Sequence, residues 1–360
     1  EVATLTFTLS ETSTNFIAAD VTVSGGTLSN FGGNGTSFTA TFTPPANSTT
    51  SGVISVASGV FTDAAGNANA DGADINNTAS ISVNTVIGQS YLGTSANDTL
   101  TGGAGNDTID GGAGTDTAQF QGKLGGYKVN MSGASGTVTD SNPGRDGTDT
   151  LKNMEHLRFT DFDVNTGIKA LASSMNTSTV QRVMELYVAF FNRTPDADGL
   201  TYWLGQSKAG TSTTQIAESF YSVGIQYTAL TGFSSAMTTT DFINVVYRNV
   251  LGRAEGADAG GLQYWTEKLT SGKESRGSLV STILDAAHTY KGDATYGWVA
   301  NLLDNKVTVA TKVAIDWGLN YLTADASVTN GMAIAKAVTA TDTAAAIALI
   351  GLPDGSVILG

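Results

Sequence analysis

The sequence predicts a multidomain protein that is built of β structure in its first 165 residues and of α structure after them. Short alternating strands run from Ala3 to about Val83, a nine-residue repeat occupies Gly93 to Gln119, and a helical spacing of apolar residues begins after Asn165. These observations predict a β-sandwich over residues 1–86, a repeat region with capping strands over 87–165, and an α-helical repeat bundle over 166–360.

Composition limits the classes of function. A chain of 360 residues with 41% hydrophobic and only 14% charged residues has enough apolar material for two or three domains. The net charge of -14 argues against nucleic acid or an anionic membrane as the main partner, and it suits divalent cations. The absence of cysteine excludes disulfides and thiolate metal sites, and no apolar run is long enough to predict a membrane span.

The first region alternates apolar and polar residues with a period of two, and clusters of Gly, Asn and Pro interrupt it. This pattern predicts strands at Thr4–Leu9, Asp20–Gly25, Ser37–Phe42, Gly52–Ala57 and Ser80–Asn84. The residues expected to face inward are Phe7, Leu9, Val21, Val23, Phe38, Phe42, Ile54 and Val56. Because the alternation is already under way at Thr4 and the chain does not begin with Met, we expect further residues upstream.

This region resembles the bacterial Ig-like domains of repetitive surface adhesins, through the segments Phe7–Glu11, Phe16–Phe31 and Phe61–Asn69. The resemblance implies an Ig-like β-sandwich, and for some relatives it implies calcium bound by Asp63, Asn67 and Glu11, with Asp20 as a further candidate. The alternative is an Asx-type turn, in which Asp63 and Asn67 bond their own backbone.

The nine-residue repeat has three copies, which read GTSANDTLT from Gly93, GGAGNDTID from Gly102 and GGAGTDTAQ from Gly111. Glycines allow tight turns whose carbonyls point inward, and carbonyl and carboxylate oxygens suit a hard cation such as Ca²⁺. The fixed period favours stacked turns over a flexible Gly/Asp-rich linker. The copies align Asp98, Asp107 and Asp116 as charged positions and Leu100, Ile109 and Ala118 as apolar positions.

The repeat resembles the RTX, or hemolysin-type, calcium-binding nonapeptides, which form parallel β-rolls. We expect calcium between consecutive turns. The expected ligands are the carboxylates of Asp98, Asp107 and Asp116 and the carbonyls of Gly102, Ala104, Gly111 and Ala113. The first copy departs from the pattern at Thr94 and Ala96, and so short a roll should need calcium to fold.

The segment Gly147–Asp161 resembles the one that follows RTX repeats in many type I secreted proteins. Its apolar residues would cover the open end of the roll as a β cap, since stacked repeats require capping. An oxygen-rich loop just before it fails the EF-hand template because the twelfth position is Leu151, so we expect a solvated turn there. The apolar residues are Leu151, Met154, Leu157 and Phe159, and the loop residues are Asp140, Asn142, Asp146 and Asp149.

The helical region contains an internal repeat, since Tyr187–Trp203 matches Tyr247–Trp265. A second helix is expected near Ser212, with Gln215 completing a capping box, and another near Ser275. A third helical unit is expected through Asp304–Leu322. The region resembles the helical domain of unassigned function in many hemolysin-type calcium-binding proteins, which is related in pattern to phycobilisome linker domains.

In this repeat Tyr187 pairs with Tyr247 and Arg193 with Arg253. The Tyr and Trp positions are expected in the core, because aromatic residues at helical spacing usually pack. The arginines are expected to pair with carboxylates such as Asp196 or Asp258. The alternative is a platform that binds glycans, formed by Trp203, Tyr202, Trp265 and Tyr264.

Sequence patterns for catalysis are missing. His156 and His288 lie in no metal or triad motif, and HExxH, GxSxG and the P-loop do not occur, so we expect no enzyme. The predicted function is that of a calcium-dependent structural or adhesive protein of a bacterial cell surface, exported by type I secretion and folded by calcium outside the cell.

The predicted partners are calcium, the secretion machinery, and either further copies of the chain or a surface glycan. Within this function, a self-assembling surface layer and a long adhesin both remain open. The export signal is expected within Thr343–Gly360. The alternative function is that of an accessory C-terminal region of a secreted RTX hydrolase whose catalytic domain lies upstream.

Overall fold

The computed structural model describes residues 2–70, 77–142 and 144–360. The chain forms two compact units, of which one holds residues 1–91, 102–109 and 139–150 and the other holds residues 92–101, 110–138 and 151–360. The chain passes between the units five times. One passage lies between Thr101 and Gly102, and the other four lie within β6 (Ser90–Leu92), β8 (Thr108–Asp110), β11 (Ser135–Asp140) and β12 (Thr148–Lys152).

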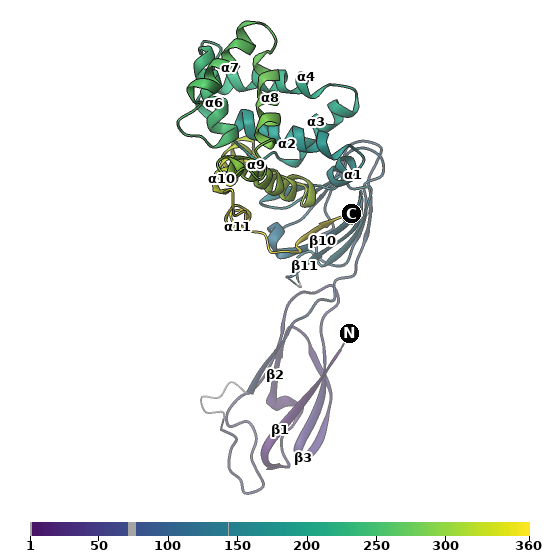
Figure 1. The fold of residues 1–360 in the computed structure, drawn as a ribbon. Coiled ribbons are helices and arrows are strands. Elements are labelled where there is room, and N and C mark those ends of the chain that lie inside the picture. The colour runs from purple at the N-terminus through teal and green to yellow at the C-terminus, as the bar shows by residue number, and fades with distance from the viewer. Residues whose placement is uncertain (1, 71–76, 143) are drawn as a thin grey trace. The chain divides into compact units, whose positions relative to one another are not determined.

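The first unit contains two antiparallel sheets. The long strands β1 (Ala3–Ser13) and β3 (Thr27–Thr43) pair with each other, and Figure 1 shows them side by side at the purple end of the chain. The second sheet has the order β2-β4-β5 and follows a 3₁₀ turn at Ala18–Asp20. Its strands are β2 (Val21–Ser24), β4 (Gly52–Val56) and β5 (Thr78–Ile81). Strand β3 is far longer than predicted from the sequence, because its first half is rich in Gly and Asn and hides the alternation.

The core of the first unit confirms the predicted inward face. Phe16, Phe38 and Phe42 are buried, and all eight predicted inward residues belong to the same apolar cluster. The ring of Phe16 packs against those of Phe7, Phe31 and Phe61 at centroid distances between 4.7 and 5.6 Å. Period-two alternation therefore identified the buried side of these strands correctly.

The second unit contains a five-stranded sheet with the order β15-β14-β13-β9-β7. Its strands are β7 (Thr99–Leu100), β9 (Thr117–Gln119), β13 (His156–Arg158), β14 (Phe162–Asn165) and β15 (Leu319–Tyr321). Strand β10 (Tyr127–Ser132), which follows a 3₁₀ turn at Leu124–Gly126, pairs in parallel with β16 (Val357–Leu359). The segment expected to carry an export signal thus ends in a paired strand.

The helices of the second unit gather into one bundle, in which α2 packs against α4, α6 and α9 (Figure 1). The helices of the two sequence repeats are α2 (Thr177–Phe191), α3 (Ala197–Lys208) and α4 (Thr213–Gly224), then α6 (Thr239–Leu251), α7 (Ala259–Thr270) and α8 (Arg276–His288). The others are α1 (Ile168–Ser173), α5 (Thr228–Thr231), α9 (Gly297–Ala310), α10 (Ala324–Ala337) and α11 (Ala344–Ala348), with a 3₁₀ turn at Ile225–Tyr227.

The internal repeat has the same local chemistry in both copies. Helices α2 and α6 end at the left-handed residues Asn192 and Gly252. Helices α4 and α8 begin at Ser212 and Ser275, each with a capping box, as predicted for Ser212.

The third helical unit differs from its prediction. Helix α9 continues as a π-helix through Thr311–Asp316, and the chain then leaves the helix at Gly318, whose φ is +60°. The next residues form β15, which pairs with β14 in antiparallel register. The prediction of helix to Leu322 was therefore wrong at its end, because strand pairing with a distant segment overrides local propensity there. In the described part of the chain, no helix is long and apolar enough to cross a membrane.

Candidate metal centre

The repeat copies stack in alternation. Strand β7 of the first copy pairs in parallel with β9 of the third copy, with Leu100 opposite Ala118. Strand β9 then pairs in parallel with β13, which places Ala118 opposite Leu157. The sequence predicts calcium between consecutive turns, and in the structure the strand of the first copy pairs with that of the third. Of the three predicted apolar positions, Ile109 and Ala118 are fully buried and Leu100 is half-buried.

In the second unit, the carboxylates of the turns form a ladder with backbone amides. The amide of Asp98 donates to Oδ1 of Asp116 at 2.8 Å, and the amide of Asp116 donates to Oε2 of Glu155 at 2.9 Å. Asp116 is completely buried, and its Oδ2 has no hydrogen-bond partner among the described residues. Asp98 is half-buried, and its Oδ2 accepts from the amide and hydroxyl of Thr94.

The first unit holds the corresponding ladder around the second copy. The amide of Gln89 donates to Oδ1 of Asp107 at 2.6 Å, and the amide of Asp107 donates to Oδ1 of Asp149 at 2.9 Å. Asp107 is 2% exposed, and its Oδ2 also lacks a partner in the described part of the chain. Two aspartates of the repeat thus carry a buried oxygen that no donor among the described residues satisfies.

The glycines of the repeat allow the turns to lie close together. A Cβ on Gly93 would lie 2.2 Å from the carbonyl oxygen of Gly111, and one on Gly111 would lie 2.2 Å from that of Asn153. Gly111 is buried, Ala113 is exposed, and Gly102 and Ala104 are half-buried. The carbonyl of Gly102 accepts from the hydroxyl of Tyr91 at 2.9 Å.

The electrostatics of the first unit are dominated by carboxylates. Burial raises the pKa of Asp149 to about 7, and the charges of Asp107, Asp146 and Asp140 act in the same direction. For Asp140 burial opposes ionisation, but hydrogen bonds from Arg145 and from the amides of Asn142 and Asp146 lower its pKa. The prediction of a solvated turn was wrong for Asp140, Asp146 and Asp149, which are all buried, and it holds only for Asn142, which is exposed.

These residues fit a hard cation. Burial of a polar group without a hydrogen-bond partner costs roughly 1–3 kcal/mol in proteins. Burial of a charged group such as a carboxylate without a partner costs more. A Ca²⁺ ion prefers oxygen ligands and would provide the counter-charge that the unpartnered oxygens of Asp107 and Asp116 lack.

The sequence interpretation missed two acidic residues of the ladders as candidate site residues, namely Asp149 and Glu155. The signal for Asp149 was present, because GTDTL at Gly147–Leu151 repeats the pattern of GNDTI at Gly105–Ile109. A Cβ on Gly147 would lie 1.8 Å from the carbonyl oxygen of Gly105, so the two turns are in contact. The intervening segment breaks the nine-residue period and conceals this relation.

The predicted site in the Ig-like region contains the expected Asx-type turn. Oδ1 of Asp63 accepts from the amides of Ala65 and Asn67, each at 2.8 Å, and Oδ2 accepts from the side chain of Asn67 at 2.7 Å. The hydrogen bonds from Asn67 lower the pKa of Asp63. Glu11 is exposed on β1, while Asp20 accepts from the amide of Ile17.

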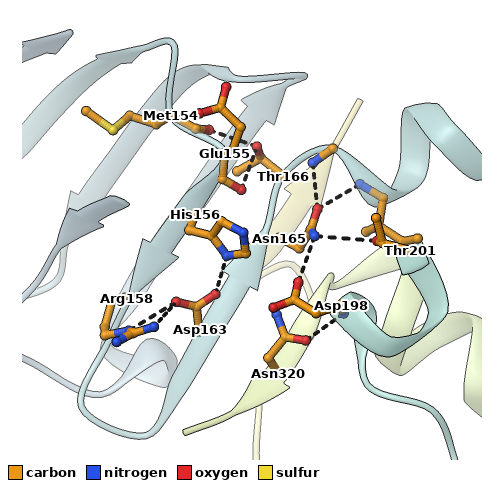
Figure 2. Close-up of polar contacts among 12 residues, drawn as sticks. Met154, Glu155, His156, Arg158, Asp163, Asn165, Thr166, Asp198, Thr201 and Asn320 are labelled. Carbon is orange, nitrogen blue, oxygen red and sulfur yellow. Dashed lines mark hydrogen bonds and ion pairs between the residues drawn. The ribbon is translucent and has the colours of Figure 1, made fainter. Parts of the chain in front are cut away.

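A second group of possible ligands, His156, Asp163 and Asp198, has ligand atoms within 4.8 Å of one another. Figure 2 shows that His156 contacts Asp163 and that Asp198 contacts Asn165. Nδ1 of His156 lies 2.6 Å from Oδ1 of Asp163, and Arg158 donates to Oδ2 of the same carboxylate. Asn165 donates to Asp198 at 2.8 Å. The Arg158 guanidinium supplies positive charge, so His156 and Asp163 belong to a satisfied ion-pair network, while Asp198 is exposed and accepts from Asn165 instead. The network raises the pKa of His156 through the hydrogen bond to Asp163.

The paired arginines of the helical repeat are confirmed. Nη1 of Arg193 lies 3.3 Å from Asp196, and Nη1 of Arg253 lies 3.2 Å from Asp258. The Tyr and Trp positions of the repeat differ in burial. Tyr187, Tyr247 and Trp265 are buried, Trp203 is half-buried, and Tyr202 and Tyr264 are exposed. Burial of Trp265 excludes the four-residue glycan platform.

Three family models match parts of the chain. A bacterial Ig-like domain matches residues 1–82, and the RTX calcium-binding nonapeptide repeat matches residues 92–118. A domain of unknown function, DUF4214, matches residues 169–223 and 229–289, which separates the two helical repeats. Comparisons with curated proteins and with solved structures found no match.

These matches agree with the residues described above. RTX nonapeptide repeats bind Ca²⁺, so calcium is the cofactor of the repeat segment at residues 92–118. Together the Ig-like domain and the repeats suggest a secreted or extracellular bacterial protein that binds calcium.

Proposed function

We propose that this chain is a calcium-dependent structural or adhesive part of a bacterial cell-surface protein, exported by type I secretion. The observation that carries the proposal is the pair of buried, unpartnered carboxylate oxygens on Asp107 and Asp116, within a segment that matches RTX repeats. A solvated linker would leave neither oxygen buried. We propose binding rather than catalysis, since the sequence contains none of the HExxH, GxSxG and P-loop motifs.

The proposed fold of the repeat is a parallel β-roll of stacked turns, with β13 and its neighbours as the cap. The support is the parallel register of β7, β9 and β13 and the burial of Leu157 against it. The three parts that were expected from the sequence remain our proposed domains.

The proposed calcium ligands lie on two sets of turns. In the second unit they are Asp98 and Asp116 with the carbonyls of Gly111 and Ala113. In the first unit they are Asp107 and Asp149 with the carbonyls of Gly102 and Ala104. A further candidate is Glu11 on β1 together with Asp63 and Asn67 of the Asx-type turn.

Calcium would couple folding to location. Without a cation, buried carboxylates repel each other and their desolvation is uncompensated, so the turns are unstable. A ligand that binds only the folded state stabilises it by mass action, by about 2.7 kcal/mol at a hundredfold excess over Kd. Low calcium inside the cell would keep the repeat open for export, and high calcium outside would fold it. The helical region, which resembles phycobilisome linker domains in pattern, would contribute binding or assembly.

Thermal unfolding with calcium and with chelator tests the calcium proposal. We expect calcium to raise the melting temperature of the wild type, and we expect Asp107→Ala and Asp116→Asn to lose most of that rise. Asp354→Asn, which changes an exposed carboxylate, serves as the matched control and should keep it. Equal melting of all variants with and without calcium would contradict the proposal.

The structural and adhesive roles differ in one observable property. Ordered two-dimensional arrays that dissolve in chelator would assign a surface layer. A soluble monomer in calcium that binds a surface polymer would assign an adhesin. A hydrolytic domain in the same reading frame would instead support an accessory role in a secreted enzyme.

A further inference from the structure

The first helical repeat places a hydroxyl between its arginine and its aspartate. Oγ of Ser327, on helix α10, donates to Oδ2 of Asp196 at 2.7 Å and accepts from Nη1 of Arg193 at 3.1 Å. Helix α10 also approaches the backbone of this repeat, because the amide of Thr194 donates to the carbonyl of Gly331 at 3.1 Å. The Arg193–Asp196 pair is therefore covered by the chain itself.

The second repeat has the same pair but a different environment. Arg253 and Asp258 contact each other at 3.2 Å, and in the described part of the chain no hydroxyl takes the place that Ser327 has in the first repeat. The pair instead lies at a cavity of about 230 Å³. The polar and aromatic residues of its lining are Tyr247, Arg253, Asp258, Trp265, Tyr290 and Tyr296.

The aromatic residues of this cavity are held in place. Nε1 of Trp265 donates to the hydroxyl of Tyr247 at 2.8 Å, and the guanidinium of Arg253 lies 5.5 Å from the ring centroid of Tyr247. Tyr290 and Tyr296 are 40% and 41% exposed, with ring centroids 5.4 Å apart. One side of the cavity is therefore formed by the buried, hydrogen-bonded side chains of Tyr247 and Trp265. Another side is formed by the rings of Tyr290 and Tyr296, which solvent can reach.

We propose that this cavity binds a neutral sugar, one pyranose ring of a surface polysaccharide. A sugar hydroxyl would donate to Asp258 and accept from Arg253, as the Ser327 hydroxyl does in the first repeat. The C–H face of the ring would pack on the electron-rich faces of Tyr290 and Tyr296.

The charge and the volume of the cavity restrict the class of ligand that it can bind. The Arg253–Asp258 pair is neutral as a whole, and the carboxylate of Asp258 disfavours an anionic group beside it. The cavity volume of about 230 Å³ is smaller than the roughly 300 Å³ at which drug-sized pockets begin, so it suits a single ring. The ligand class deepens the adhesive part of the proposed function, but the cavity shares no residue with the proposed calcium ligands.

Chemical-shift mapping of the ¹⁵N-labelled full chain in calcium tests the proposal. The probes are glucose, galactose, mannose and N-acetylglucosamine, each titrated separately, with glycerol as a hydroxylated probe without a ring. We expect saturable shifts of the Trp265 indole and the Gly261 amide with at least one sugar and none with glycerol.

Three variants provide the comparison. Tyr296→Ala removes a half-exposed ring, and Asp258→Asn removes the acceptor charge while asparagine can still cap helix α7. We expect each to weaken sugar binding by roughly tenfold, equivalent to about 1.4 kcal/mol. Tyr264→Ala removes a ring that is 50% exposed and does not line the cavity, so it should bind like the wild type. If Tyr296→Ala does not fold, Tyr290→Ala replaces it.

Absence of saturable shifts with all four sugars would overturn the proposal, as would undiminished binding by both cavity variants. Self-association that is lost in Tyr296→Ala, without sugar binding, would assign the cavity to a second copy of the chain and would also overturn it. Calcium-dependent melting is measured on the same samples. A failure of sugar binding with intact calcium stabilisation therefore affects this proposal alone.

Discussion

Asp149 is a buried carboxylate that faces other carboxylates. It is 1% exposed, it accepts from the amide of Asp107, and the charges of Asp107, Asp146 and Asp140 disfavour its ionised form. The same features make it a suitable calcium ligand and a source of instability without calcium. Asp149→Asn keeps an acceptor for the Asp107 amide while it removes the charge.

For Asp149→Asn we expect opposite effects in the two conditions. In chelator the variant should be more stable than the wild type by about 1 kcal/mol, because like-charge repulsion and burial of a charge are relieved. In saturating calcium it should be less stable, because a charged ligand is lost. Chemical denaturation in both conditions measures the change, and lower stability in chelator would contradict the assignment.

Lys306 is a buried cation on helix α9. It is 6% exposed, and burial lowers its pKa from 10.5 to about 8. Between these two values the unfolded chain binds more protons than the folded chain, so the free energy of unfolding should increase as the pH rises from about 8 toward 10.5. Below pH 8 the folded state carries the full cost of the buried charge.

Lys306→Met should remove this cost. We expect the variant to be more stable than the wild type near pH 7 by roughly 1–3 kcal/mol, and we expect the difference to shrink as the pH rises. Comparing the two proteins by denaturation at several pH values isolates Lys306 from the tyrosines that titrate in the same range. Lys208→Met, which changes an exposed lysine, should show no such trend.

At the scale of elements, helix α10 depends on a close approach to the first repeat. A Cβ on Gly331 would lie 2.9 Å from the carbonyl oxygen of Thr194, which is backbone and cannot turn aside. A Cβ on Gly205, in helix α3, would lie in open space. The two glycines therefore separate the effect of packing from that of helix propensity.

We expect Gly331→Ala and Gly205→Ala to change stability in opposite directions. Gly331→Ala should destabilise by about 1–3 kcal/mol, because α10 must move away from Thr194. Gly205→Ala should stabilise by up to about 1 kcal/mol, because alanine is the better helix former. Thermal unfolding measures both, and stabilisation by Gly331→Ala would show that α10 tolerates displacement.

Features that depend on residues close together in the sequence could be predicted from the sequence. The sequence predicted the capping box at Ser212 and the ion pairs of the two matched arginines, because neighbouring residues determine helix ends and helical spacing. Pairings between distant segments were not visible. The sequence of β15 predicts helix, and nothing local indicates that β14 is its partner.

The candidate site divides in the same way. The repeat predicts Asp98, Asp107 and Asp116 as candidate ligands and calcium as the metal, because the period is short and local. It did not reveal that the first copy stacks on the third, or that Asp149 and Glu155 extend the ladders. Those relations depend on which turns stack, and the stacking is decided by packing across longer stretches of chain.

At the scale of the whole molecule, the balance of forces differs between the repeat and the helices. The chain carries a net charge of -14, and the repeat concentrates buried carboxylates such as Asp107, Asp116 and Asp149. Helices α2 and α6 are instead held by fully buried apolar residues such as Val183 and Ile243. Removal of calcium should therefore destabilise the repeat before it destabilises the helices.

Hydrogen exchange with calcium and with chelator tests this difference. In chelator we expect fast exchange at the amides of Asp98, Asp107 and Asp116, because the carboxylates that accept from them lose their counter-charge and the turns separate. The amides of α2 and α6 should keep their protection, because their burial does not depend on a cation. Equal loss of protection across the repeat and the helices would show instead that calcium supports the cooperative folding of the whole chain.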